Sequence, residues 1–287
     1  MSRVPPPMDM TAAEVERGYN NRAAVPEHPE WFARWAASSQ AARERYRPTL
    51  DVRYGTGPKE TLDLFVPAGT PRGTLLFVHG GYWRSLDKAE HAFVAGPFVE
   101  QGFAVAVPNY DLCPQVTIAE IVEETRRCIA WLVREGARHG ADASTLVVSG
   151  HSAGGHLAAM MVATPASGFG LDRHPVAAAV TVSGVHDLRP LVLFSFNADF
   201  RLDDAEAARM SPALLAPASR VPVLVAVGAD ETGEFLRQSR LMWDAWPANR
   251  PAGDAGPLEV RGRHHFSIVH DYADPDSALT RRTLALF

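Results

Sequence analysis

The chain has 287 residues, of which 46% are hydrophobic and 21% charged, as in ordinary folded globular domains. Its formal net charge of −5 argues against a nucleic acid or a membrane as a partner. Residues 1–10 lack the apolar core of a signal peptide, and no apolar run reaches bilayer-spanning length. Cys113 and Cys128 have no metal-ligand spacing and are expected as reduced thiols. We therefore expect one cytoplasmic α/β domain over residues 1–287, with no cofactor.

The first expected element is a helical segment over residues 11–47. A helix should start after Pro29 and carry Trp31, Phe32 and Trp35 on one face. These aromatic side chains would dock the segment onto the main body of the protein. A sharper interpretation is that the segment also covers one wall of a pocket.

Short strands and helices then alternate along the chain. Residues 50–54 and 61–66 flank a Gly-Thr-Gly-Pro turn and are predicted to pair antiparallel. Apolar runs typical of buried strands follow at residues 74–78, 103–107, 145–149, 177–182 and 223–227, with a shorter one at 258–260. Helical stretches lie between them at about 91–101, 118–138, 156–163 and 235–246. The alternation predicts a mostly parallel sheet of about eight strands, with helices on both faces and the antiparallel pair at one edge.

Residues 183–217 interrupt this alternation, because they mix helix formers with Gly, Asn, Asp and Pro. Such an insertion is expected to pack over the strand ends as a small cap. It would shape a substrate pocket there, since loops placed by a rigid sheet commonly carry binding residues.

The stretch from Thr145 to Ala159 combines an apolar strand, the sequence Gly-His-Ser-Ala-Gly and a helix-forming run of small residues. This is the setting of a nucleophile elbow, with Ser152 at the apex of a strained turn. Gly150 and Gly154 would remove Cβ atoms that clash where strand and helix approach each other. The helix N-terminus would favour a developing anion. The alternative is an ordinary glycine-rich turn between a strand and a helix.

A serine nucleophile needs a base and an acid that orients the base. Asp230 follows the strand at 223–227, and His265 follows the last short strand, so that Ser152, Asp230 and His265 have the chain order of α/β-hydrolase triads. Glu231 is a second candidate for the acid, but Asp230 is favoured because it is closer to the strand end and stiffer. His264 competes with His265 for the role of base, and spacing does not choose between them.

The strand at 74–78 ends in His79-Gly80-Gly81-Tyr82-Trp83, a variant of the His-Gly-Gly-Gly loop of esterases. We expect the N–H groups of Gly81, Tyr82 and Ala153 to form an oxyanion hole, in which one donor contributes about 3–4 kcal/mol. Tyr82 replaces the third glycine, so its side chain should lean away from the nucleophile. Trp83 would offer a flat surface near the scissile bond. A turn that merely ends a strand is the alternative.

Three motifs resemble those of the arylformamidases, or kynurenine formamidases, of the α/β-hydrolase superfamily: His79-Gly80-Gly81-Tyr82-Trp83, Gly150-His151-Ser152-Ala153-Gly154-Gly155-His156, and His264-His265-Phe266. The resemblance runs almost end to end and includes Tyr19-Asn20-Asn21-Arg22, Asn109-Tyr110-Asp111-Leu112 and Ser183-Gly184-Val185-His186-Asp187. It implies an α/β-hydrolase fold and a triad of Ser152, Asp230 and His265, because the histidine before phenylalanine is the base in that family. It also implies metal-free hydrolysis of N-formyl-L-kynurenine to L-kynurenine and formate.

The expected function is therefore that of a serine hydrolase acting on a small aromatic amide or ester. An aryl formamide is the first hypothesis, a small-acyl carboxylesterase the second, and a non-catalytic binding protein with a hydrolase fold the third. Residues expected to form the substrate pocket are Trp83, Tyr19, Phe194 and Asn197, together with Trp31 and Phe196. A homodimer is the default expectation for the assembly.

Overall fold

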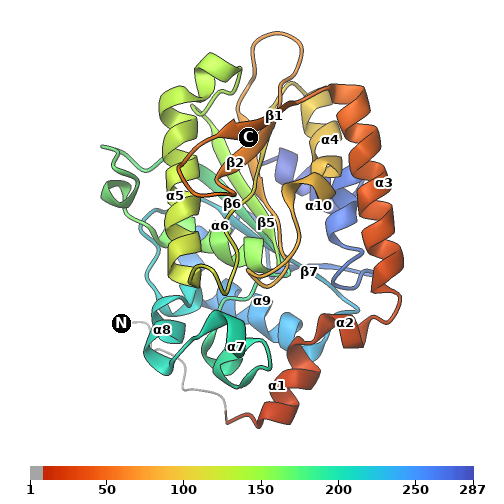
Figure 1. The fold of residues 1–287 in the computed structure, drawn as a ribbon, viewed down its shortest axis with the longest axis vertical. Coiled ribbons are helices and arrows are strands. Elements are labelled where there is room, and N and C mark those ends of the chain that lie inside the picture. Colours follow the sequence, from red (N-terminus) through yellow and green to blue (C-terminus); the bar gives the residue numbers. More distant parts are fainter. Residues whose placement is uncertain (1–8) are drawn as a thin grey trace.

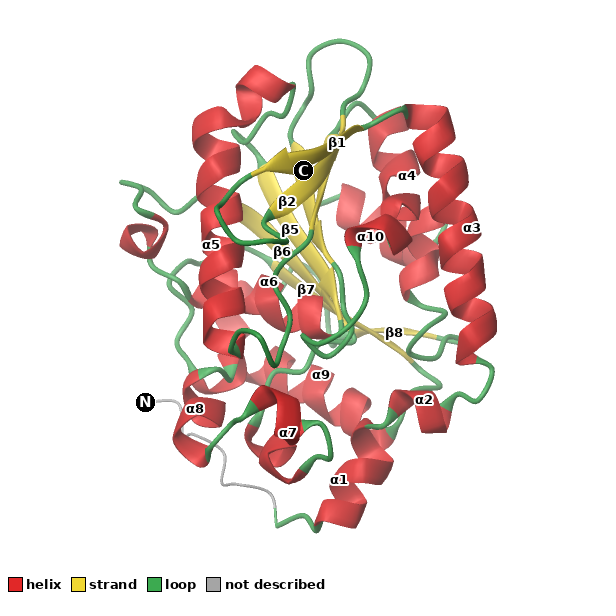
Figure 2. Cartoon of the chain, in the orientation of Figure 1, coloured by secondary structure: helices red, strands yellow, loops and turns green. Residues whose placement is uncertain are grey.

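The computed structural model describes residues 9–287, so expectations for residues 1–8 lie outside it. Eight strands form one sheet in the order β1-β2-β4-β3-β5-β6-β7-β8 (Figures 1 and 2). The strands are β1 (Thr49–Arg53), β2 (Thr61–Phe65), β3 (Thr74–Val78), β4 (Ala104–Pro108), β5 (Leu146–His151), β6 (Val176–Val182), β7 (Val223–Gly228) and β8 (Leu258–Val260). β2 pairs antiparallel with β1 and β4, and the remaining pairs are parallel. The predicted sheet is confirmed, including its antiparallel edge.

The helices cover both faces of this sheet. They are α1 (Ala12–Tyr19), α2 (Asn21–Ala24), α3 (His28–Tyr46), α4 (Ala95–Glu100), α5 (Ile118–Glu135), α6 (Ala153–Ala163), α7 (Asn197–Phe200), α8 (Asp204–Arg209), α9 (Gly233–Ala245) and α10 (Ala278–Leu284). In Figure 1, α5 and α6 lie on one side of the strands, and α3, α4 and α10 lie on the other.

Two hydrophobic cores result from the alternation of side chains along the strands. In β3, Leu76 and Val78 belong to the core under α5, α6 and α9, whereas Leu75 and Phe77 belong to the core under α3, α4 and α10. Successive residues of a strand point to opposite faces, so a strand covered on both sides has to be apolar throughout. All five residues of β3 are buried.

Local sequence signals explain where the helices begin. α1 and α5 start with capping boxes, formed by Thr11 with Glu14 and by Thr117 with Glu120. α3 carries a proline at its start, as expected from Pro29. The helix predicted at 91–101 is interrupted: residues 88–94 form two short 3-10 turns, and the α-helix begins only at Ala95.

The insertion between β6 and β7 contains no strand. Its chain forms the 3-10 turn Arg189–Leu193, the short helices α7 and α8, and a further 3-10 turn at Pro212–Leu214. Together with α1 and α9, these elements gather at one end of the sheet (Figure 1). Among residues 9–287, no helix is both long enough and apolar enough to cross a membrane.

The sheet order brings together the loops that follow β3, β5, β7 and β8. β3 lies beside β5, and β7 lies beside β8, with all four strands parallel. In a doubly wound sheet, binding sites form at the carboxyl ends of such strands. The loop after β3, the elbow after β5 and the loops after β7 and β8 therefore meet at one edge.

Candidate active site

Ser152 occupies a strained turn between β5 and α6. Its backbone has φ 57° and ψ −116°, values that a residue other than glycine rarely adopts. A Cβ at Gly150 would lie 2.1 Å from the carbonyl oxygen of Gly154, and one at Gly154 would lie 2.0 Å from the carbonyl oxygen of Val78. The reason predicted for both glycines is thus confirmed, and the turn has the geometry of a nucleophile elbow.

The loop after β3 lies directly against this elbow. A Cβ at Gly80 would approach the Cβ of Ser152 to 3.0 Å. Gly81, Tyr82 and Trp83 have φ values of 102°, 51° and 54°, so the loop turns sharply over three residues. Within the described chain, the N–H groups of Gly81 and Tyr82 donate to no protein acceptor. Ala153 opens α6, where the first N–H groups have no acceptor within the helix. These donors lie where an oxyanion hole was expected.

His265 is held by a buried carboxylate. Its Nδ1 lies 2.7 Å from Oε2 of Glu231, and the side chains are 5% and 0% exposed, respectively. The second carboxylate oxygen, Oε1, accepts hydrogen bonds from the Gly228 N–H at 2.8 Å and from the Ser183 hydroxyl. A buried carboxylate with this many donors is well satisfied. It fixes the imidazole with Nδ1 as donor, leaving Nε2 without a hydrogen-bond partner in the described part of the chain.

This pairing corrects the prediction that Asp230 is the acid. Asp230 is exposed, and its N–H donates to the carbonyl of Arg263 at 3.0 Å. A tight turn follows β7, in which the Glu231 N–H bonds to the Gly228 carbonyl at 3.2 Å. The turn brings Glu231 back over the strand end and directs Asp230 to solvent. Being closer to the strand in sequence therefore did not favour Asp230.

The structure also separates His265 from His264. His264 Nδ1 accepts hydrogen bonds from the N–H groups of Phe266 and Ser267, at 3.2 and 3.3 Å, and its ring packs edge-on against Trp31. Burial lowers the pKa of His264. By contrast, the carbonyl of His265 accepts a hydrogen bond from His151 Nε2 at 2.8 Å, and its ring lies 4.6 Å from that of His151. His264 is thus turned away from the elbow, whereas His265 lies beside it.

Ser152 and His265 line the same cavity, which has a volume of about 200 Å³. This is smaller than the range of about 300–1,000 Å³ usual for drug-sized ligands, so it suits a small substrate. The N-terminal segment supplies one wall through Asn20, Asn21, Arg22, Phe32 and Trp35. The loop after β3 supplies Gly81, Tyr82 and Arg84, and the insertion supplies Phe196. The interpretation that the N-terminal segment covers a pocket wall is confirmed.

Comparison with known proteins identifies the family. A family model described as BD-FAE matches residues 62–243. A kynurenine formamidase from Salmo salar is 32% identical and covers 86% of this chain and 85% of its own length. One from Drosophila melanogaster is 30% identical, with coverage of 83% and 81%. A solved structure from Silicibacter sp., described as a candidate thioesterase, is 34% identical with a TM-score of 0.83, covering 93% of this chain and 98% of the other.

The chain belongs to the kynurenine formamidase family of α/β-hydrolases. It is therefore an enzyme, and the resemblance inferred from its motifs is confirmed.

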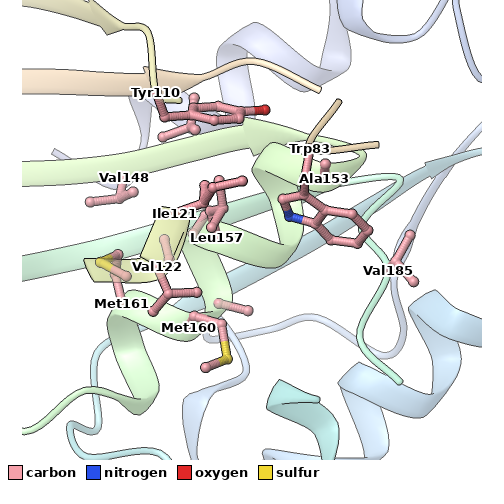
Figure 3. Packing of buried hydrophobic residues seen from close by; sticks show 14 of the residues in the cluster. Trp83, Tyr110, Ile121, Val122, Val148, Ala153, Leu157, Met160, Met161 and Val185 are labelled. Carbon is pink, nitrogen blue, oxygen red and sulfur yellow. The ribbon is translucent and has the colours of Figure 1, made fainter. Parts of the chain in front are cut away.

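Of the six residues predicted for the substrate pocket, only Phe196 lines the cavity; the prediction is wrong for Trp83, Tyr19, Phe194, Asn197 and Trp31. Trp83 is 0% exposed, and its ring packs edge-on against His156, near Ala153 and Leu157 in the core (Figure 3). Consecutive positive φ values turn Tyr82 toward the cavity and Trp83 under α6.

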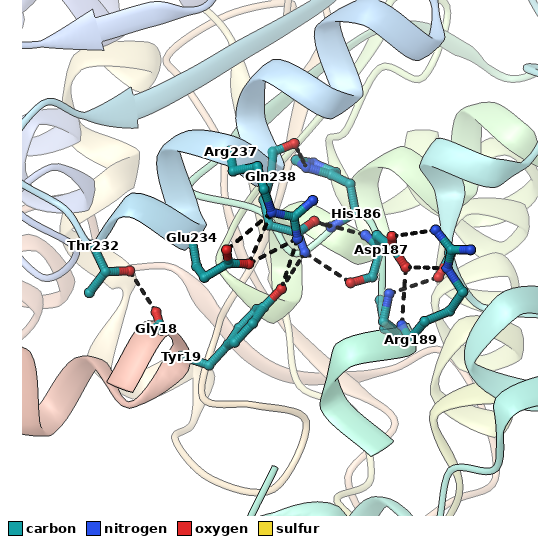
Figure 4. Close-up of polar contacts among 11 residues, drawn as sticks. Gly18, Tyr19, His186, Asp187, Arg189, Thr232, Glu234, Arg237 and Gln238 are labelled. Carbon is teal, nitrogen blue, oxygen red and sulfur yellow. Dashed lines mark hydrogen bonds and ion pairs between the residues drawn. The ribbon is translucent and has the colours of Figure 1, made fainter. Parts of the chain in front are cut away.

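Three more of the predicted pocket residues have structural roles. Tyr19 is fully buried, and its hydroxyl accepts from Gln238 Nε2 at 2.7 Å (Figure 4). Phe194 is 2% exposed and packs between Tyr82 and Tyr19. Asn197 donates to the carbonyls of Val192 and Leu202 and so closes a turn of the insertion. From that region only Phe196 was correctly expected at the cavity.

Tyr82 holds the N-terminal segment in place. Its hydroxyl donates to the carbonyl of Tyr19 at 2.6 Å. The Thr232 hydroxyl, one residue after Glu231, donates to the carbonyl of Gly18 at 2.6 Å (Figure 4). The segment is thus tied both to the loop after β3 and to the loop that carries Glu231. The next residues in the chain, from Asn20, are positioned by these bonds as the cavity wall.

Other buried groups near the site are neutral or structural. His79 Nδ1 donates to the Gly80 carbonyl, and the His79 ring stacks on that of Tyr110; burial lowers the pKa of His79 to about 4. Burial also lowers the pKa of His151 well below its usual value. Cys113 and Cys128 are free and buried. Residues 9–287 contain no group of three His, Cys, Asp or Glu side chains arranged to hold a metal ion.

Proposed function

We propose that this hydrolase cleaves an aryl formamide, N-formyl-L-kynurenine, to L-kynurenine and formate. Ser152 is the nucleophile, His265 the base and Glu231 the acid that orients it. The observation that carries the proposal is the buried bond from His265 Nδ1 to Glu231 Oε2, made by a histidine that shares a cavity with a strained serine elbow. Kynurenine formamidases aligned over most of the chain support the choice of substrate.

In the first half of the reaction, Ser152 Oγ attacks the formyl carbon while His265 Nε2 takes the hydroxyl proton. Glu231 stabilises the imidazolium that forms, through its bond to Nδ1. The oxyanion accepts hydrogen bonds from the N–H groups of Gly81, Tyr82 and Ala153. The C–N bond then breaks, and the leaving aryl amine takes from Nε2 the proton that came from the Ser152 hydroxyl. The products of this half are free kynurenine and a formyl ester on Ser152.

Water completes the cycle in the second half. His265 removes a proton from water, whose oxygen attacks the formyl ester and forms a second tetrahedral intermediate. Collapse of this intermediate expels Ser152 Oγ, which takes the proton from Nε2. Formate leaves and the enzyme returns to its starting state. No group outside the chain, apart from water, is required for the atoms and electrons to balance.

The size of the cavity supports a formyl substrate. A formyl carbon carries only a hydrogen besides its oxygen and nitrogen, so it needs no acyl pocket beside Ser152. The volume of about 200 Å³ can then be used for the leaving group. Phe32, Trp35 and Phe196 give that space aromatic walls, which suit a flat aryl amine.

The second candidate is a small-acyl esterase with the same residues. It is favoured by the solved structure described as a candidate thioesterase, to which this chain is 34% identical. Esters and formamides are cleaved through the same acyl-serine chemistry, and they differ in the size of the acyl group and in the need to protonate a leaving amine.

A substrate series on the purified protein tests the proposal. N-formyl-L-kynurenine should be hydrolysed with a higher kcat/KM than p-nitrophenyl acetate, and butyrate and hexanoate esters should be poorer still. Labelling by a fluorophosphonate should occur in the wild type and be absent from Ser152→Ala. A wild-type protein that neither labels nor turns over any member of the series would instead be a non-catalytic binding protein.

A further inference from the structure

The charge on the cavity wall has one sign. Among the described residues that line the cavity, Arg22 and Arg84 carry permanent positive charges, and none is Asp or Glu. Arg84 is compensated, because its Nε lies 2.6 Å from Oδ2 of Asp199. Arg22 has no carboxylate within ion-pairing distance anywhere in residues 9–287. Glu90 interacts with Arg22 only at a distance longer than an ion pair, and a cation on the wall of a cavity attracts anions.

The residue before Arg22 has an unpaired polar group. Asn21 is only 4% exposed and lines the cavity, yet its side-chain Nδ2 has no hydrogen-bond partner within the described chain. Buried amide donors in native proteins are nearly always paired, so an orphan at a cavity wall indicates an acceptor supplied by a ligand.

The geometry of the segment leaves these two groups available. Asn20 is used locally: its Oδ1 caps α2 by accepting from the Ala23 N–H at 3.1 Å, and its Nδ2 donates to Glu16. The guanidinium of Arg22 lies 5.5 Å from the ring centre of Phe32, which also lines the cavity. Asn21 and Arg22 thus both line the cavity, on a segment that the bond from Tyr82 to Tyr19 holds in place.

We infer that Asn21 and Arg22 bind a carboxylate on the leaving-group side of the substrate. The inference rests on the proposed function and adds the two residues that recognise the anionic tail of its substrate. Arg22 supplies the charge, and Asn21 Nδ2 supplies a directed hydrogen bond to a carboxylate oxygen. An ammonium group on the same tail meets no acidic residue on the cavity wall and should face solvent.

Three substrates and four proteins test this inference. The substrates are N-formyl-L-kynurenine, its carboxamide, which lacks the anion, and formanilide, which lacks the whole tail. The proteins are the wild type, Arg22→Met, Asn21→Asp and the control Arg34→Met. Arg34 is a matched control because its guanidinium also lies over an aromatic ring, that of Trp31 at 4.9 Å, but it does not line the cavity.

The wild type should prefer the acid to its carboxamide by about tenfold or more in kcat/KM, as expected for one charged hydrogen bond. Arg22→Met should abolish most of this preference, mainly by raising KM for the acid. Asn21→Asp keeps the size of the side chain but adds a negative charge, so it should lower the ratio further. Arg34→Met should keep the wild-type ratio.

Equal kcat/KM values for acid and carboxamide in the wild type would overturn the inference, as would an unchanged ratio in Arg22→Met. Hydrolysis of formanilide in either case would show that the proposed formamidase function stands without it. If none of the three formamides is hydrolysed while p-nitrophenyl esters are, the proposed function fails, and the inference fails with it.

Discussion

The carboxylate of Glu231 lies 2.7 Å from Nδ1 of His265 and is shielded completely from solvent, whereas the adjacent Asp230 is exposed. Two further donors, the Gly228 N–H and the Ser183 hydroxyl, fix the orientation of the Glu231 carboxylate. Two neighbouring acidic residues in the chain thus have opposite surroundings, and they allow a direct test of which one orients the base.

Glu231→Gln should lower kcat severely, by an amount on the order of 10⁴-fold, because an amide in this place stabilises the wrong tautomer of the base. The matched variant Asp230→Asn should stay close to wild type, since that side chain contacts solvent. Steady-state kinetics with N-formyl-L-kynurenine measures both. The reverse order of effects would restore Asp230 as the acid.

Ser152→Ala and His265→Ala should each reduce kcat by up to about 10⁶-fold without loss of the fold, because triad members act as a unit. His264→Ala should retain most activity, since His264 packs on Trp31 outside the cavity. Circular dichroism would verify folding in each variant. An inactive, folded His264 variant beside an active His265 variant would show that the base is assigned to the wrong histidine.

Tyr82→Phe should raise KM more than it lowers kcat, because the lost hydroxyl anchors the segment that forms the cavity wall. The lost hydrogen bond should also cost about 1 kcal/mol of unfolding free energy. Tyr46→Phe is the matched control: its hydroxyl bonds to Glu100, and the residue does not line the cavity. Equal kinetic effects of the two substitutions would argue against the anchoring role.

Stability should fall on acidification, because several histidines are buried in the neutral form. Burial lowers the pKa of His79 and His156 to about 4 and that of His91 and His186 to about 3, from an ordinary value of 6.5. Below pH 6.5 the unfolded chain binds protons that the folded protein does not. The contribution of each buried histidine to the unfolding free energy is therefore fully present above pH 6.5. It is lost as the pH falls toward the pKa of the folded state, by at most about 1.4 kcal/mol per pH unit.

Urea unfolding at pH 7.5, 6 and 5 measures this loss. His91→Gln should make the unfolding free energy fall less steeply with decreasing pH. Glu124 opposes the trend, because burial raises its pKa to about 7 and its contribution is lost as the pH rises toward that value. An unfolding free energy that stays constant from pH 7.5 to 5 would contradict the neutral state of these histidines.

The fold could be predicted largely from the sequence because buried strands have to be apolar on both faces. The run at 74–78 coincides with β3, and the run at 223–227 differs from β7 by one residue. The sequence does not predict the short helices of the insertion individually. They are stabilised by local caps such as Asp203 at α8, which give too short a signal in the sequence.

The elbow could be predicted because the packing of strand and helix requires glycine at 150 and 154. The acid could not, since a turn after β7 decides which of two adjacent carboxylates returns to the sheet. The position of the Trp83 side chain depends on positive φ values at Tyr82 and Trp83, and these residue types do not predict positive φ. Asn21 and Arg22 belong to one of the sequence motifs, but only the structure shows that they line the cavity, on a segment held by the bond from Tyr82 to Tyr19.

The central claim is that Ser152, His265 and Glu231 hydrolyse an aryl formamide. The most direct test compares kcat/KM for N-formyl-L-kynurenine with kcat/KM for p-nitrophenyl acetate and butyrate, using Ser152→Ala as the blank. The formamide should be the best of the three substrates despite its poorer leaving group, and the Ser152→Ala blank should be inactive on all of them. Fast hydrolysis of the butyrate ester with no release of kynurenine would contradict it and assign the protein as a carboxylesterase.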